Sequence, residues 1–130
     1  MQDADFSDDF CRFIQRAIPT VDAAELLLAL AAEPDRLWER TQLPAKLRPA
    51  LAIPDAEAAR YMETFQASGL LVPASGNRVQ YRPASRELAS QATVLAQAYA
   101  ERPVTLIRMI YALRDAKIRS FAEAFKLTRK

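Results

Sequence analysis

The chain has 130 residues, of which 51% are hydrophobic and 26% charged, with a net charge of +2. It contains no histidine, one cysteine and two glycines. This is the composition of a single folded domain, and it excludes imidazole-based catalysis, histidine or thiolate zinc sites, an internal disulfide and glycine-rich phosphate loops. We therefore expect no metal and no cofactor.

Two helices are predicted in the N-terminal part of the chain. The first, about Asp5 to Ala17, is amphipathic and carries an apolar stripe at helical spacing. That stripe consists of Phe6, Phe10, Phe13, Ile14 and Ala17. The second helix begins at a cap, either Thr20 or Asp22, and runs to about Ala32. Because it is apolar on nearly every side, we expect it to be central.

The middle of the chain is predicted to form a short extended piece and two more helices. The extended piece is Leu37–Glu39, and a short helix follows over about Pro44–Leu51, since proline is favoured at a first helical position. The next helix covers about Asp55–Ser68 and ends at Gly69, where glycine adopts positive φ at little cost. Its buried stripe should consist of Ala58, Met62 and Phe65.

A β-hairpin should follow this glycine. Its first arm is Leu70–Val72, its turn is Pro73–Asn77, and its second arm, Arg78–Arg82, alternates apolar with polar residues. The alternation predicts that Val79 and Tyr81 point inward.

The remainder of the chain is predicted to be helical. One helix covers about Ser85–Glu101, and Pro103 begins another. We expect this second helix to place four apolar residues on one side, namely Val104, Ile107, Ile110 and Tyr111. A basic segment then carries Ile118, Phe121 and Phe125 at helical spacing.

This order of elements over Val21–Ala84 resembles the winged helix-turn-helix superfamily of bacterial transcriptional regulators. The stretch Asp55–Pro83, DAEAARYMETFQASGLLVPASGNRVQYRP, is similar to their recognition helix and wing. The resemblance implies a mainly α fold with a small β-hairpin. It divides the chain into an N-terminal helix (1–19), a winged helix-turn-helix domain (20–84) and a C-terminal helical extension (85–130).

The resemblance also implies which residues contact double-stranded DNA. The helix over Asp55–Ser68 would enter the major groove, and the hairpin would contact phosphates or the minor groove. The implied DNA-binding residues are Glu57, Arg60, Tyr61 and Thr64 on the helix and Asn77, Arg78, Gln80 and Arg82 on the hairpin. The other interpretation is that Arg60 pairs with Glu57 or Glu63, and that the hairpin arginines are only solvated.

Charge is distributed unevenly along the chain. Residues 1–57 hold eleven acids and six bases, net −5, whereas residues 58–130 hold five acids and twelve bases, net +7. This asymmetry is consistent with a polyanionic partner and equally with solvated helix faces that differ by chance. The acidic N-terminus is unlike a signal peptide, and no apolar run approaches the ~18 residues of a membrane span, so we expect a cytoplasmic protein.

These observations favour a DNA-binding transcriptional regulator that acts as a homodimer, and not an enzyme. The expected dimer contacts lie in the C-terminal extension at Leu88, Leu95, Tyr99, Ile107, Ile110, Phe121 and Phe125. The alternative is a winged-helix module that contacts another protein without reading DNA. In the basic tail, Arg114 to Lys130, we expect Ile118, Phe121 and Phe125 to pack on this domain or on a twin subunit. The alternatives are that this tail meets a membrane surface, a partner helix or nucleic acid.

Overall fold

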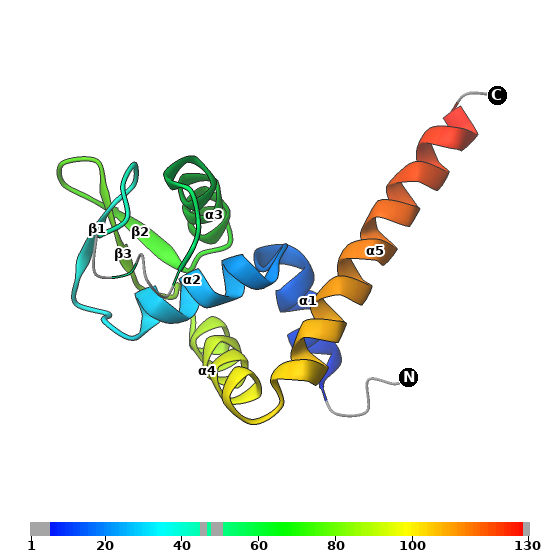
Figure 1. Cartoon of the computed structure of the whole chain (residues 1–130), viewed down its shortest axis with the longest axis horizontal. Helices are drawn as coiled ribbons and strands as arrows, with labels where there is room; N and C mark the ends of the chain where they lie inside the picture. The colour runs from blue at the N-terminus through cyan, green and yellow to red at the C-terminus, as the bar shows by residue number, and fades with distance from the viewer. Residues whose placement is uncertain (1–5, 45–46, 48–50, 129–130) are drawn as a thin grey trace.

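The structure, a computed structural model, describes residues 6–44, 47 and 51–128, and for 116–128 it describes the course of the backbone. In chain order the elements are α1 (Asp8–Ala17), α2 (Val21–Ala31), β1 (Leu37–Glu39), α3 (Asp55–Ala67), β2 (Leu71–Ala74), β3 (Arg78–Tyr81), α4 (Arg86–Glu101) and α5 (Pro103–Thr128). The sheet and α3 lie on one side of the molecule and α1 with α5 on the other, with α2 between them (Figure 1). The mainly helical fold with a small antiparallel sheet is as predicted.

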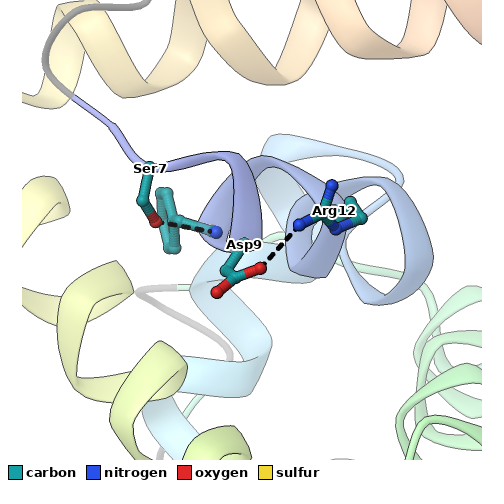
Figure 2. A network of polar contacts seen from close by, with 4 residues as sticks. Ser7, Asp9 and Arg12 are labelled. Atoms are coloured by element: carbon teal, nitrogen blue, oxygen red, sulfur yellow. Dashed lines mark hydrogen bonds and ion pairs between the residues drawn. The ribbon is translucent and has the colours of Figure 1, made fainter.

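Hydroxyl side chains mark where α1, α2 and α4 begin. Ser7 caps α1, where its Oγ accepts a hydrogen bond from the Phe10 amide at 3.0 Å (Figure 2). Thr20, one of the two predicted caps, does the same for α2 at the Ala23 amide. Ser85 caps α4. Each cap satisfies a backbone N–H that has no partner within its own helix.

Figure 2 also shows an ion pair on α1, in which Arg12 Nη2 lies 2.6 Å from Asp9 Oδ1. Both side chains are largely exposed, so water screens the pair and it contributes little to stability. The predicted apolar stripe of α1 is buried in full. Burial of this stripe, rather than the ion pair, therefore holds α1 on the rest of the molecule.

The second helix is the centre of the core. Ala23, Ala24, Leu26, Leu27 and Leu30 are all 0% exposed. The helices α3 and α4 and strand β3 pack against α2. The expectation that this helix is central is confirmed.

The hairpin belongs to a three-stranded antiparallel sheet in the order β1-β3-β2. The segment Leu37–Glu39 supplies the third strand, with Trp38 opposite Val79 and both side chains buried. The strand β2 runs further than predicted, because Pro73 and Ala74 pair with β3. Proline is tolerated there because β2 is an edge strand.

The predicted glycine stop of α3 is confirmed at Gly69, whose φ is +87°. The Gly69 amide donates to the carbonyl of Gln66, and the Leu70 amide donates to the carbonyl of Phe65 at 2.8 Å. This is a Schellman motif, which satisfies the last carbonyls of the helix. It turns the chain directly from α3 into β2, so that helix and hairpin are adjacent.

The C-terminal part differs from the expectation in two respects. The segment after Pro103 and the basic segment form one continuous helix, α5. The side of α5 that packs on the core carries Leu106, Met109 and Ile110, which are buried. Val104 and Tyr111 were expected on this same side, but they are 61% and 50% exposed. The second half of α5 extends away from the rest of the molecule (Figure 1).

The predicted short helix Pro44–Leu51 lies mostly outside the described residues. Its described part includes a turn in which the Leu47 amide donates to the Pro44 carbonyl at 3.0 Å. Leu43 and Leu51, on either side, are buried against the core.

Phe65 provides a test of the packing between α3 and the core. Its side chain is 0% exposed, so Phe65→Ala leaves a cavity and should lower the free energy of unfolding by about 3–5 kcal/mol. Urea denaturation followed by circular dichroism measures this loss. The exposed neighbour Glu63, changed to alanine, is the control and should shift stability by less than about 0.5 kcal/mol. A Phe65→Ala loss below about 1 kcal/mol would contradict the assigned burial of this helix face.

Candidate nucleic-acid interface

The start of α3 is held by the carboxylate of Asp55. No side-chain hydroxyl caps this helix, because its N-cap residue is Pro54. Asp55 Oδ1 accepts a hydrogen bond from the Leu43 amide at 3.2 Å and so ties the helix start to the loop before it. Its negative charge also lies at the positive end of the helix, where it is stabilising. Asp55 therefore has a structural role at the helix end.

The buried side of α3 is wider than expected. Ala58, Met62 and Phe65 are buried as predicted, but Tyr61 is buried with them at 7% exposure. The Tyr61 hydroxyl accepts a hydrogen bond from Thr20 Oγ1 at 2.9 Å and donates to Glu57 Oε2 at 2.6 Å. The expectation that Tyr61 lies on the solvent face of α3 is thus corrected. A buried phenol needs hydrogen-bond partners, and α2 and α3 together supply them.

This contact changes the acid–base behaviour of Tyr61. Burial and the neighbouring Glu57 carboxylate raise the pKa of the Tyr61 phenol above its ordinary value of 10.0. Both effects disfavour the phenolate, the first by removing water and the second by repulsion. Tyr61 is therefore a neutral hydrogen-bonding bridge between α2 and α3, and the Glu57 side chain points along α3 to this bridge.

Two of the predicted DNA-binding side chains, Arg60 and Thr64, remain on the solvent face of α3, and Glu63 lies there with them. Arg60 and Glu63 are exposed, and Thr64 is half-buried with its Oγ1 donating to the Arg60 carbonyl at 3.2 Å. The predicted ion pairs of Arg60 with Glu57 or Glu63 do not form among the described residues. The Arg60 guanidinium is thus directed to solvent without an acidic partner.

The predicted DNA-binding residues of the hairpin fall into two groups. Arg78 folds back on the turn, where its Nε donates to the Ser75 carbonyl at 2.8 Å, and Gln80 Nε2 donates to the Pro34 carbonyl at 3.1 Å. Arg78 therefore stabilises the hairpin turn, and Gln80 ties the hairpin to the segment between α2 and β1. Asn77, at the tip with φ +60°, and Arg82, at the base, are exposed.

Glycine is required at the hairpin tip for two reasons. Gly76 has φ +73°, a conformation that side chains disfavour, and a Cβ there would lie 3.3 Å from Arg78 Nε. Glycine thus permits the tight turn and leaves room for Arg78. The hairpin packs beside α3 (Figure 1), so Arg60 of the helix and Arg82 of the strand end belong to neighbouring elements.

The predicted dimer residues whose side chains are described differ in exposure. Leu95 and Ile110 are 0% and 1% exposed within the chain itself, so they have no surface to offer to a second copy. Tyr99 is half-buried and donates to Glu25 Oε2 at 2.6 Å. Leu88 and Ile107 are half-buried, and the side chains of Phe121 and Phe125 lie outside the described ones. Leu95 and Ile110 are therefore already covered by the chain itself, and a dimer contact through the other residues stays a prediction.

The hydrogen bonds that Tyr61 and Tyr99 make between helices were not predicted from the sequence. Both phenols bridge helices that are distant in sequence, and each bonds to a glutamate. The spacing of Tyr61, three residues after Ala58 and four before Phe65, is the one local signal that it joins the buried stripe. Nothing in the sequence near Tyr99 identifies Glu25 as its partner.

The described residues contain neither a candidate metal site nor a candidate membrane span. No group of three or more Cys, Asp and Glu side chains is arranged to hold a metal ion there. No helix in the described ranges has the length and apolar character needed to cross a membrane. Comparison with protein-family models, curated proteins and solved structures gave no match.

The bridge between α2 and α3 can be tested with Tyr61→Phe. The loss of its two hydrogen bonds should cost about 0.5–1.5 kcal/mol of unfolding free energy at neutral pH. The folded protein holds the phenolic proton more tightly than the unfolded chain does, because the pKa of Tyr61 is raised. Its stabilising contribution is therefore complete below pH 10 and is lost as the pH rises through the folded-state pKa.

The measurement is urea denaturation of both proteins between pH 7 and pH 11. The stability gap between wild type and Tyr61→Phe should narrow above pH 10. A gap that stays constant or widens over this range would show that the phenol is not held in its neutral form by Glu57.

Proposed function

We propose that the chain is a winged-helix DNA-binding protein, a transcriptional regulator of the cytoplasm that acts as a homodimer and not as an enzyme. The order of elements from α2 to β3 and the sheet order β1-β3-β2 support a winged-helix arrangement. In that arrangement α3 is the recognition helix and the β2–β3 hairpin is the wing. The proposed contact with DNA follows from this assignment.

The observation that carries the proposal is the pairing of an exposed helix face with an exposed hairpin, both bearing arginine without acidic partners. Arg60 on α3 and Arg82 after β3 make no ion pair within the described residues, and Arg86 at the start of α4 is likewise exposed. Guanidinium groups in this state bind phosphate oxygens or guanine edges without first breaking an internal pair.

The acidic residues of α3 differ in how far they oppose contact with DNA. Asp55 bonds to the Leu43 amide and Glu57 bonds to the Tyr61 hydroxyl, so both carboxylates are engaged within the chain. Glu63 is the acid on α3 that stays exposed. We therefore assign base reading to Arg60 with Thr64, and phosphate contact to Arg82 with Asn77. Arg78 and Gln80 support the hairpin.

The assignment predicts that substitutions of Arg82 and of Arg60 affect DNA binding in different ways. Arg82→Ala should weaken binding to all duplexes alike and lower the slope of log K against log salt by about one unit, because one phosphate contact is lost. Arg60→Ala should instead reduce the preference between sequences, by about 1–3 kcal/mol for each base pair read. Fluorescence anisotropy with selected and scrambled duplexes over a salt series measures both effects.

Arg16→Ala is the matched control, since Arg16 is an exposed arginine on α1 that belongs to neither α3 nor the hairpin. It should leave the salt slope and the sequence preference unchanged. The groove-reading proposal fails if wild type binds no duplex at low salt. It also fails if Arg16→Ala reduces binding as much as Arg82→Ala does.

One observation favours contact with a protein instead. Burial and the nearby Glu25 and Glu57 carboxylates raise the pKa of Asp22, which indicates an excess of negative charge where α2 meets α3. A basic protein partner would fit such a surface. In this second candidate the winged-helix fold serves as an interaction module and α3 does not enter DNA.

Glu63→Gln distinguishes the two candidates. Removing a negative charge that faces phosphate should strengthen non-specific duplex binding several-fold, because the repulsion is lost. Glu63 is not part of the Asp22, Glu25 and Glu57 cluster, so the same substitution should leave binding of a basic protein partner to that cluster unchanged. Filter binding or anisotropy at low salt gives the result. Unchanged duplex binding would remove the α3 face from the proposed DNA contact and favour the protein-contact candidate.

A further inference from the structure

The outer side of α5 presents large apolar residues to solvent. Val104 and Tyr111 are 61% and 50% exposed, and with Leu37 they are the large hydrophobic side chains found exposed in the described part of the chain. They are seven residues apart in one helix, so they lie on nearly the same side of it. The opposite side of α5, with Leu106 and Ile110, is already buried against this chain.

The sequence continues this seven-residue spacing into the second half of α5. Ile118 and Phe125 follow Tyr111 at steps of seven, which gives one column of four apolar positions, 104, 111, 118 and 125. A second column three positions on contains Ile107, Arg114 and Phe121. Two such columns are the a and d positions of a coiled coil, in which another helix packs along the seam.

The described residues leave the part of this seam at Val104 and Tyr111 uncovered. The second half of α5 extends away from the body of the molecule, while α1 and α4 pack on the first half (Figure 1). The 26 residues of α5 correspond to a helix about 39 Å long at a rise of ~1.5 Å per residue. The exposed first half and the projecting second half are therefore of similar length.

We propose that the seam is covered by α5 of a second copy of this chain, running antiparallel, so that the projecting half of each helix covers the exposed half of the other. Pairing centred near residue 116 sets position 107 opposite 125 and position 111 opposite 121. The two copies are then related by a twofold axis, and each contributes the same surface.

Arg114 determines the direction of the helices. In a parallel pair the two Arg114 residues would face each other at a d position, where two guanidinium charges repel. In the antiparallel pair position 114 lies opposite position 118 of the other copy, and the aliphatic part of arginine can cover an apolar neighbour. The antiparallel arrangement thus accommodates the one charged residue in the seam.

This inference rests on the homodimer part of the proposed function. It keeps Ile107, Phe121 and Phe125 from the dimer contacts expected from sequence and leaves out the other four. It is tested without DNA, so its failure is distinguishable from failure of the α3 and hairpin contact. A dimer of this kind would leave α3 and the hairpin of both copies uncovered by the seam, because they lie on the other side of each molecule from α5 (Figure 1).

Sedimentation equilibrium of the full chain tests whether a second copy of the chain covers the seam. Wild type should show twice the 14.6 kDa chain mass, and Tyr111→Glu should return it to the single mass. Ala112→Glu is the matched control, because it adds the same charge at the next exposed position, outside the two columns, and should leave the dimer intact. Both changes are at exposed positions, and circular dichroism checks that both variants remain folded.

A monomeric wild type, or a dimer that survives Tyr111→Glu, would overturn the proposal. A monomer that binds anionic phosphatidylserine vesicles in a Tyr111-dependent way would overturn it in favour of a membrane surface. Spin labels at Arg108→Cys in a Cys11→Ser background test the direction. The antiparallel pair predicts a label separation of about 25 Å, and a separation near ~10 Å would show a parallel pair instead.

Discussion

The burial of α2 is the constraint on which the rest of the structure depends. A helix with leucine and alanine on nearly every side is stable in water only if other elements cover nearly every side of it. Here α3, α4 and β3 do so, and five of its eleven residues are 0% exposed. The positions of α3 and of the hairpin relative to each other, and so of Arg60 and Arg82, follow from this need to cover α2.

The polar contacts around α2 then determine which charges reach solvent. Tyr61 joins Thr20 of the α2 cap to Glu57 of α3, and Tyr99 of α4 bonds to Glu25 of α2. Each tyrosine hydroxyl donates a hydrogen bond to a glutamate carboxylate and so fixes where that carboxylate lies. The exposed charges on the solvent face of α3 are Arg60 and Glu63.

Local signals were enough to predict most of the fold. Capping hydroxyls, the glycine after α3 and the proline before α5 act over a few residues, so Thr20, Ser85, Gly69 and Pro103 gave reliable boundaries. The candidate site was predicted less well, because it depends on contacts that are distant in sequence. The Tyr61 hydroxyl, for example, accepts its hydrogen bond from Thr20, which is 41 residues away in the chain. The helix α5 has apolar residues on two sides, and only its packing on α1 and α4 decides which side is buried.

The central claim is that the solvent face of α3 and the hairpin form one surface that contacts DNA. Backbone amide shifts measured by NMR during titration with a short duplex at low salt test it most directly. The account predicts that the shifted amides are confined to α3 near Arg60 and Thr64, to the hairpin near Asn77 and Arg82, and to the start of α4. Shifts centred on α1 or α5, or no shifts at all with the protein folded, would contradict it.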